Sequence, residues 1–508
     1  MPERFSGGLV DLKVYLFAAF LIIMYILHLR ATRLRVIPKG VPWVGLQNEW
    51  FSKTRANIRE LLSSKLNIEE GYQKYGKHGK PYITPNLTFK AEVMLPPSYI
   101  SWLLAQPDSV LSIHKVLLAD VEFDYTSPRS WKFVRPFHNE ALNKMDLNSV
   151  TGAMIEEIPE SVEETLGSVP GKWTRVGVQA SMSTILTRIT NRVFVGKEIN
   201  FVNKIGQCAA IIAYLIPAML KPLLGPLVAL PVRYYDHRCS RYLVPLIQTH
   251  LDQATAAKDA HHGESNQDML QLMARFAAKS NDPLDRDPRS LSARILALNF
   301  VGIHTSSAAA MNALVNILCA GPEVFASLRR EAASVLRGNG GIWDKAAVGR
   351  LVLMDSTLRE SLRFSAFKAR GVERQVVKRG GVVLPDGTLL PEGTKVGVPI
   401  IEIHKDPEFY DDPEVFRHDR FVGRAELGMV NTTDTFLAFG CGRHACPGRF
   451  FSAHELKLLF AHIVLHYDFK FLDERPRSIY LSDFCFMPEE VFFESCRRQR
   501  SAHLDLEA

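Results

Sequence analysis

The chain has 508 residues, of which 47% are hydrophobic and 23% are charged, so it can bury a large globular core and is not a disordered polymer. The formal net charge of +7 is modest for this length, and no basic block outside the N-terminal flank indicates nucleic-acid binding. The seven cysteines are odd in number and scattered, which indicates reduced thiols on a cytosolic face and excludes a disulfide framework. No linker divides the chain, so we expect one large domain.

An apolar run from residue 9 to residue 29 lies close to the start of the chain. A helix needs about 20 residues to cross a bilayer, so this run is just long enough. A cluster of arginines follows it without a small-residue cleavage site, which favours keeping that side in the cytoplasm. We therefore expect an uncleaved membrane anchor at residues 1–35, a proline-containing hinge at 36–50 and a catalytic domain at 51–508.

Trp131 and Arg135 are the next informative pair. They lie one helical turn apart and therefore share a face. On residue type alone this is a surface arginine beside a core tryptophan.

The stretch 205–232 is very apolar, but prolines interrupt it at four positions. Proline removes a helical hydrogen bond and kinks the backbone, so this stretch is not expected to form a second straight membrane span.

A helical pattern runs from its expected cap, Ser290, to residue 319. Such a helix is about 45 Å long, the diameter of a domain, so we expect its centre to be buried. His304, Thr305 and Ser306 lie at that centre, where hydroxyl and imidazole groups need partners. Either Thr305 bonds back to a helix carbonyl and His304 is a satisfied core residue, or these groups handle protons.

Glu360 and Arg363 lie at i and i+3 of one expected helix, so their side chains can form a charge-paired hydrogen bond. Such pairs are common on protein surfaces, where they contribute little to stability. Farther along, the runs 381–390 and 396–403 combine glycine, proline and β-branched residues, which predicts strands and hairpins.

The decapeptide from Phe439 to Gly448 contains three glycines and precedes an apolar run at residues 449–469. Glycine lets the backbone lie close against a flat ligand, and Cys446 lies just ahead of the expected helix, whose N-terminus favours a thiolate. On residue type alone, Cys446 could equally be a small buried hydrophobic residue.

A zinc site is a rival interpretation of the same decapeptide, because Cys441, His444 and Cys446 are all possible ligands. A zinc finger needs a second ligand pair at regular spacing, and the sequence contains none. This absence disfavours zinc.

The order of residues in the decapeptide resembles the cysteine-ligand loop of the cytochrome P450 superfamily. Phe439, Gly442, Cys446 and Gly448 match that loop, and His444 stands where most members have arginine. The resemblance implies a mainly α fold with small β-sheets, formed by a single large haem domain behind an N-terminal membrane anchor. It also implies that His444 contacts a haem propionate as the charged imidazolium.

The resemblance covers essentially the whole chain. The segment 416–421 is similar to a Phe-x-Pro-x-Arg-Phe segment of the family, which implies that Arg420 joins Glu360 and Arg363 in a buried triad that supports the cysteine loop. Cys446 would be the axial ligand of the iron. The other haem-binding residues that the resemblance implies are Phe439, Gly442, Arg443, His444, Gly448, Trp131, Arg135, Arg374 and Gly302.

In the family, a small residue, a glycine, an acid and a threonine on the central helix deliver protons to bound oxygen. Gly302, Thr305 and Ser306 match this pattern, but Val301 replaces the small residue and His304 replaces the acid. The implied catalytic residues are thus Thr305, Ser306 and His304. Two proton routes stay open: His304 relays protons near neutral pH, or the hydroxyls draw them through water or a substrate hydroxyl.

In its details the chain looks most like fungal secondary-metabolism members of the kaurene-oxidase-like type. The resemblance implies a monooxygenase of the endoplasmic reticulum membrane, single-pass, with a cytoplasmic catalytic domain that contains haem b. It implies that the enzyme uses O2 and takes electrons from NADPH-cytochrome P450 reductase, with cytochrome b5 as a second possible donor. The implied substrate is a bulky apolar terpenoid, indole-terpenoid, steroid or polyketide. Substrate contacts are expected from residues 111–125, 211–230, 300–305, 367–372 and 484–487.

Two other function classes stay open. A haem-thiolate isomerase or dehydratase would use the same cysteine loop without O2, and the missing acid at His304 is its one supporting feature. A non-catalytic haem-binding protein is disfavoured, because it does not require Thr305 on a central helix. Consumption of NADPH and O2 in the presence of reductase would separate the three.

Overall fold

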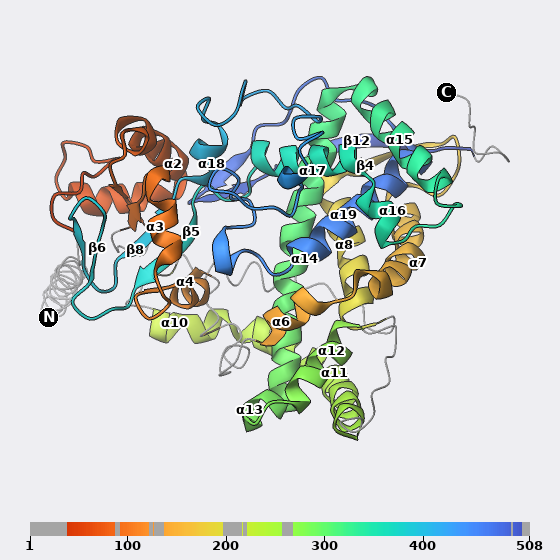
Figure 1. The fold of residues 1–508 in the computed structure, drawn as a ribbon, viewed down its shortest axis with the longest axis horizontal. Coiled ribbons are helices and arrows are strands. Elements are labelled where there is room, and N and C mark those ends of the chain that lie inside the picture. Colours follow the sequence, from red (N-terminus) through yellow and green to blue (C-terminus); the bar gives the residue numbers. More distant parts are fainter. Residues whose placement is uncertain are drawn as a thin grey trace, which may run out of the picture.

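The structure is a computed structural model, and it describes residues 38–86, 92–120, 125, 137–196, 216, 221–256, 268–488 and 491–499. The expected anchor, Trp131 and Arg135 lie outside the described residues. Most of the described chain is helical (Figure 1). The helices are α2 (Ser52–Lys74), α3 (Ile100–Ala105), α4 (Ile113–Asp120), α6 (Phe137–Lys144), α7 (Leu147–Leu166), α8 (Val178–Phe194), α10 (Lys221–Val228), α11 (Leu230–Ala256), α12 (Met269–Ala278), α13 (Pro283–Arg286), α14 (Pro288–Ala320), α15 (Pro322–Arg337), α16 (Lys345–Gly349), α17 (Val352–Phe364), α18 (Ile400–His404) and α19 (Arg449–His466).

The strands form small sheets. The largest has the order β1-β2-β8-β5-β3, in which β2 and β8 are parallel and the other neighbours antiparallel. A second, antiparallel sheet has the order β4-β12-β9, and β6-β7 and β10-β11 form hairpins. The strands are β1 (Tyr82–Thr84), β2 (Glu92–Met94), β3 (Leu111–Ser112), β4 (Trp173–Gly177), β5 (Gly371–Val376), β6 (Val382–Val383), β7 (Leu389–Leu390), β8 (Lys395–Val398), β9 (Tyr467–Phe469), β10 (Ile479–Leu481), β11 (Phe484–Phe486) and β12 (Phe492–Arg497).

The helix α14 runs through the middle of the molecule (Figure 1). It begins at Pro288, and the Asp287 carboxylate caps it by accepting hydrogen bonds from the backbone N–H groups of Arg289 (3.2 Å) and Ser290 (3.1 Å). The prediction of Ser290 as the cap is therefore wrong, because aspartate directly before proline satisfies the first free N–H groups better. Among the described helices, α14 alone is long and apolar enough to cross a membrane, but 61% of its most apolar window is buried inside the protein, as in a core helix.

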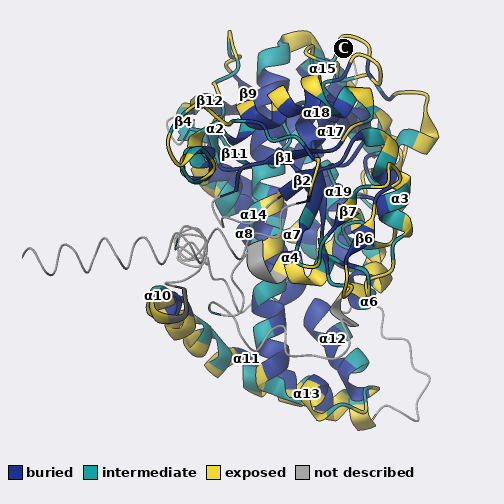
Figure 2. Cartoon of the chain, turned by 90° about the vertical axis from the view of Figure 1, so that its left-hand side faces the viewer, coloured by how far each residue is buried: buried dark blue, intermediate teal, exposed yellow. Residues whose placement is uncertain are grey.

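Two large apolar clusters fill the interior (Figure 2). The helical cluster, which includes Leu314 and Leu459, is built by α7, α8, α14, α15, α17 and α19. The sheet cluster, which includes Val396, Leu437 and Cys441, lies against the largest sheet. The chain passes from the sheet cluster into the helical cluster over the decapeptide, so this loop is fixed by a core at each end.

Candidate active site

The decapeptide forms a tight loop directly before α19. Gly440 and Gly442 both have φ 69°, a left-handed conformation that side chains with a Cβ rarely adopt. The loop closes where the Cys446 N–H donates to the Phe439 carbonyl at 2.8 Å. Arg449, the first residue of α19, donates from Nη1 to the Cys446 carbonyl at 2.8 Å. These contacts hold Cys446 in one position at the start of the helix.

The Cys446 thiol shows a balance of opposing effects. Burial raises its pKa, while the backbone N–H groups of Gly448 and Arg449 and the charge of Arg449 lower it. The N–H groups at the start of the helix thus favour a thiolate, as expected, but burial has the larger effect on the pKa of the thiol. A bound metal cation reverses this balance, since a coordinating thiol is deprotonated. The site thus fits a thiolate that forms when iron binds.

Cys441 has different surroundings from Cys446. It is buried in the sheet cluster, with Sγ 3.9 Å from Asp434 Oδ1, and burial raises the pKa of its thiol. Cys441, His444 and Cys446 do not come together as a ligand set, and no group of three or more His, Cys, Asp or Glu side chains in the described residues could hold a metal ion. The zinc interpretation is therefore wrong.

Polar side chains gather beside the loop around Asp108. His444 Nε2 lies 2.8 Å from Asp108 Oδ1, and Arg443 Nη2 lies 3.4 Å from the same oxygen. Arg374 on β5 is buried, and its Nη1 donates a hydrogen bond to the Glu373 carbonyl at 2.8 Å. Arg443 and His444 therefore share one carboxylate, and the Arg374 guanidinium is near enough to lower the pKa of His444. This excess of positive charge fits ligand carboxylates such as haem propionates.

Several groups act on the pKa of His444. Burial lowers the pKa of its imidazole, Asp108 raises it, and the nearby cations Arg374 and Arg443 lower it. Burial and the two cations together outweigh the carboxylate in the protein chain. The charged imidazolium beside a haem propionate, whose carboxylate would act in the same direction as Asp108, stays a prediction.

A bulge in β5 fixes the position of Arg374. The pairing of β5 with β8 shifts register between Gly371 and Arg374, and Val372 inside this bulge has φ 51°. A β-branched residue rarely adopts positive φ, and bulges are commonly used to redirect a side chain. Burial lowers the pKa of Arg374 to about 10, so its guanidinium remains charged at neutral pH.

One face of α14 is open at the centre of the helix. Val301 is 44% exposed, and Thr305, one turn later, is also exposed. Ile303, which lies between them in the sequence, and Ser306, which follows Thr305, are buried. Thr305 Oγ1 donates to the Val301 carbonyl at 2.9 Å, which is the back-bonding that the sequence left open. An exposed face on the central helix of a large core indicates open space beside Val301 and Thr305.

The other central residues of α14 face different neighbours. The His304 ring packs edge-on against Phe300, with ring centroids 4.7 Å apart. A Cβ at Gly302 would meet Thr190 at 3.8 Å and Phe194 at 3.9 Å, so this glycine faces α8. Ser306 is buried, and its Oγ lies 3.3 Å from Ser452 Oγ on α19. Ser306 therefore joins the central helix to the helix that follows the cysteine loop.

The structure brings Glu360, Arg363 and Arg420 together. Arg363 donates from Nε and Nη2 to the two oxygens of Glu360, both at 2.8 Å, and Arg420 Nε donates to Glu360 Oε1 at 3.0 Å. The side chains of Glu360 and Arg363 are completely buried, and that of Arg420 is 7% exposed. Arg363 also donates to the backbone carbonyls of His404 and Pro413, so the triad fixes α17 to the end of α18 and to a loop.

Comparison with known proteins identifies the chain. A sequence model described as "Cytochrome P450" matches residues 114–493. The chain belongs to the cytochrome P450 family. Three fungal relatives are the cytochrome P450 monooxygenases polB of Polytolypa hystricis (31% identity; 88% of this chain and 91% of the relative), efuH of Hormonema carpetanum (30%; 92% and 88%) and gloP of Glarea lozoyensis (31%; 92% and 91%).

Among solved structures, the P450 fold is matched by a cyanobacterial CYP120A1 with bound retinoic acid. The TM-score is 0.63 at 16% identity, over 91% of this chain and 99% of that one, which supports the fold alone. The fold prediction is thus confirmed, and the protein is a P450 monooxygenase, an enzyme class with a haem-thiolate cofactor that uses O2, a small-molecule substrate and a redox partner.

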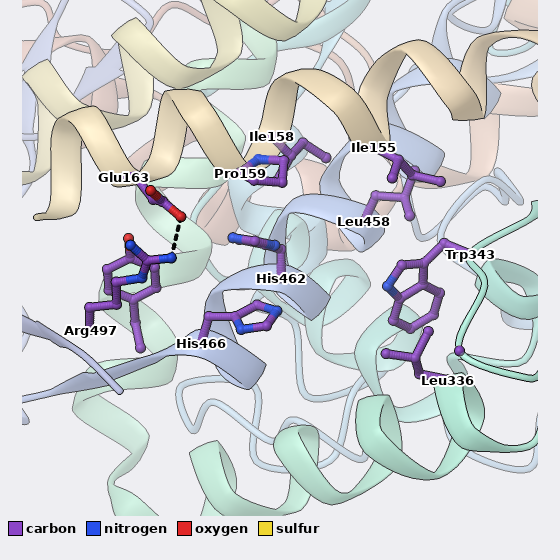
Figure 3. Close-up of a pocket in the computed structure, with 12 residues that line it drawn as sticks. Ile155, Ile158, Pro159, Glu163, Leu336, Trp343, Leu458, His462, His466 and Arg497 are labelled. Atoms are coloured by element: carbon purple, nitrogen blue, oxygen red, sulfur yellow. Dashed lines mark ion pairs between the residues drawn. The ribbon is translucent and has the colours of Figure 1, made fainter. Parts of the chain in front are cut away.

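A separate cavity of about 240 Å³ lies on the far part of α19 (Figure 3). His462 and His466 lie side by side in it, with ring centroids 4.4 Å apart, and Arg497 forms an ion pair with Glu163 at one end. Burial lowers the pKa of His462 to about 3, so its ring is neutral. None of the predicted P450 site residues lines this cavity.

The sequence reasoning missed four residues of the site. Asp108 lies in a short polar turn that gave no signal, and Thr190 and Ser452 look like ordinary helix residues. Glu455 did give a signal: it lies one turn after Phe451 on an otherwise apolar helix face, where a carboxylate is unusual.

Proposed function

We propose that this P450 holds haem b through Cys446 and oxidises a bulky apolar small molecule. The observation that carries the proposal is the position of Cys446, fixed at the start of α19 by the closed loop with backbone N–H groups beside its sulfur. The haem, when bound through a thiolate, supplies O–O bond cleavage and oxidation of an unactivated C–H bond.

The chain's own residues hold the cofactor in this proposal. Arg443 and His444, which both contact the Asp108 carboxylate, would bind the propionates together with the buried Arg374 nearby. The resemblance adds Trp131 and Arg135. The half-buried ring of Phe439 and the backbone at Gly442 and Gly448 would face the macrocycle. Gly302 has no such role in the proposal, because its open side faces α8.

The open face of α14 supports the proposal that the substrate is apolar. Val301 presents a hydrocarbon side chain to that space, and the Thr305 hydroxyl one turn later is bonded back to the helix. Two of the expected substrate segments, 367–372 and 484–487, lie side by side, because Cys485 N–H donates to the Phe367 carbonyl at 2.8 Å. We propose a terpenoid, indole-terpenoid, steroid or polyketide as the substrate. Metabolite profiling of a host that lacks the gene would identify it.

Thr305→Ala is expected to uncouple turnover. The variant lacks the one hydroxyl that Thr305 holds on the open face of α14 to pass protons, so reducing equivalents would be diverted to hydrogen peroxide. We expect product formed per NADPH to fall by about tenfold, on the order of the smallest effects of losing a proton donor, measured with purified reductase. Thr187→Ala is a matched control, because Thr187 also bonds back to a carbonyl, of Ser183, but lies on α8 away from the open face. Full coupling in Thr305→Ala would revive the O2-independent isomerase or dehydratase alternative.

The redox partner and the membrane complete the proposal. NADPH-cytochrome P450 reductase, with cytochrome b5 as a second donor, would supply electrons to an enzyme anchored in the endoplasmic reticulum by residues 9–29. An apolar stripe on α10 and α11 supports membrane association, since Leu223 is 70% exposed and Leu227, Leu230 and Tyr234 follow at helical spacing, each more than half exposed.

Removal of residues 1–35 is expected to leave haem binding intact and to release most of the protein from membranes. The apolar stripe should keep a residual, detergent-sensitive association. Membrane flotation measures the released and the membrane-bound fractions. Adding Leu223→Asp and Leu227→Asp to the truncated chain should abolish the residual membrane association. A truncated chain that binds no haem would show that the boundary of the catalytic domain is wrong.

A further inference from the structure

The cavity on the far part of α19 contains two histidines that the proposed function does not use. His462 and His466 lie four residues apart on α19, so they project from one face of the helix. Their rings lie side by side, with centroids 4.4 Å apart and planes at 42° to each other (Figure 3). Two histidines at this spacing on a helix can bind a single zinc ion, as they do in His-Glu-x-x-His helices.

The distance between the two rings fits one shared ion. A zinc ion binds an imidazole nitrogen at about 2.0–2.1 Å, which places the centres of two rings on one tetrahedral ion roughly 5 Å apart. The 4.4 Å between the His462 and His466 centroids is within about 1 Å of that separation. Small rotations of the two side chains therefore suffice to direct one nitrogen of each ring at the same point.

The protonation state of His462 also suits a metal ligand. A metal ion binds imidazole in its neutral form, so a protonated ring must first release its proton. Burial lowers the pKa of His462 to about 3, and His466 and Arg497 act in the same direction. Near neutral pH, therefore, no proton competes with a metal ion for His462.

The rest of the cavity provides space and a balanced charge. Its volume of about 240 Å³ can hold several water molecules. Among the described residues that line it, the acidic side chain of Glu163 on α7 and the basic side chain of Arg497 on β12 form an ion pair with each other. Apolar side chains such as Ile158, Trp343 and Leu458 form much of the remaining wall. The described chain thus offers an ion two neutral nitrogens, and water must supply its other ligands.

We propose that His462 and His466 together bind one Zn²⁺ ion, with water molecules as its remaining ligands. Imidazole suits Zn²⁺, Cu²⁺ and Ni²⁺, whereas Mg²⁺ and Ca²⁺ prefer oxygen ligands. The site is distinct from the haem site, because none of the predicted haem-binding residues lines the cavity. With only two ligands from the chain, the ion exchanges with solvent, and it stabilises the folded protein according to its free concentration.

X-ray absorption at the zinc edge tests the ligands directly in the haem-loaded, full-length chain without a polyhistidine tag. The haem metal is iron, so the zinc edge reports only the added ion. In the parent protein, the bound Zn²⁺ should have two imidazole nitrogens at about 2.0–2.1 Å and oxygen atoms in the other positions. A zinc shell with one imidazole or none would overturn the proposal, and this measurement requires no variant to fold.

Equilibrium dialysis distinguishes the two histidines from other zinc ligands on the surface. His462→Ala and His466→Ala should each weaken zinc binding by about tenfold or more, since losing even a hydrogen-bond partner of a ligand has an effect of this size. His78→Ala removes an exposed histidine of the short helix after α2 and should bind zinc like the parent. Equal zinc binding by the parent and by the double variant of His462 and His466 would mean an adventitious ion only, which overturns the proposal.

Thermal unfolding measures the same binding through stability. Saturating Zn²⁺ should raise the unfolding midpoint of the parent, because the ion binds the folded site, whereas Mg²⁺ at the same concentration should not. The rise should be absent from the double variant of His462 and His466 and retained in His78→Ala, and a parent midpoint that Zn²⁺ leaves unchanged would contradict the site. The Soret band of the reduced carbon monoxide complex should be the same with and without Zn²⁺; a changed band would show that zinc acts at the haem site instead.

Discussion

Glu360→Ala should prevent the protein from accumulating in a folded, haem-loaded form. The substitution leaves the Arg363 guanidinium buried without its carboxylate and removes the partner of Arg420 Nε. Removing one partner of a buried ion pair costs about 3–5 kcal/mol, a large share of the 5–15 kcal/mol that keeps a typical protein folded. Thermal unfolding and the yield of soluble haem protein measure the loss.

A matched control for Glu360→Ala is Glu414→Ala. Glu414 pairs with Lys405 at 2.7 Å, but its side chain is 67% exposed, so its removal should cost at most about 1 kcal/mol. If Glu360→Ala unfolds within a few degrees of the Glu414→Ala protein, the triad does not support the cysteine loop, and α17 must be held by its apolar contacts alone.

Cys446→Ala is expected to abolish monooxygenase activity. The loop should still close, because its hydrogen bonds involve the backbone of Cys446 and the Phe439 carbonyl, and alanine keeps both. What disappears is the thiolate ligand and with it O–O cleavage. Haem content, NADPH consumption and product formation with reductase measure the effect.

Cys441→Ala is the control for Cys446→Ala. Cys441 lies in the same loop, but its sulfur is buried in the sheet cluster beside Asp434, so its loss should reduce stability slightly and leave activity intact. The opposite result, with Cys441 required and Cys446 dispensable, is incompatible with the proposed site.

The fold and much of the site could be predicted because their signals are local. The spacing of Glu360 and Arg363 predicted their contact, and the resemblance of a short segment added Arg420; all three meet in the structure. The back-bonding of Thr305 to Val301 was one of two alternatives that helix geometry leaves open. The glycines around Cys446 indicated a backbone that needs conformational freedom, and Gly440 and Gly442 do adopt positive φ angles.

The rest depends on contacts between elements that are distant in the sequence. Glu455 and Thr190 are 265 residues apart, so no local pattern predicts that one accepts a hydrogen bond from the other. The pKa of His444 depends on burial and on Asp108 and Arg374, which come from other segments of the chain. For Cys446, the sequence indicates the helix N-terminus that favours a thiolate, but it does not indicate the burial that opposes it.

The reduced protein in complex with carbon monoxide offers the most direct test of the haem-thiolate site. A full-length chain reconstituted with haem b should show the far-red-shifted Soret band that a cysteine thiolate ligand produces, and Cys446→Ala should lack it while Cys441→Ala retains it. A reduced carbon monoxide complex of the parent protein with the Soret band of a neutral ligand such as histidine would contradict the assignment of Cys446 as the axial ligand.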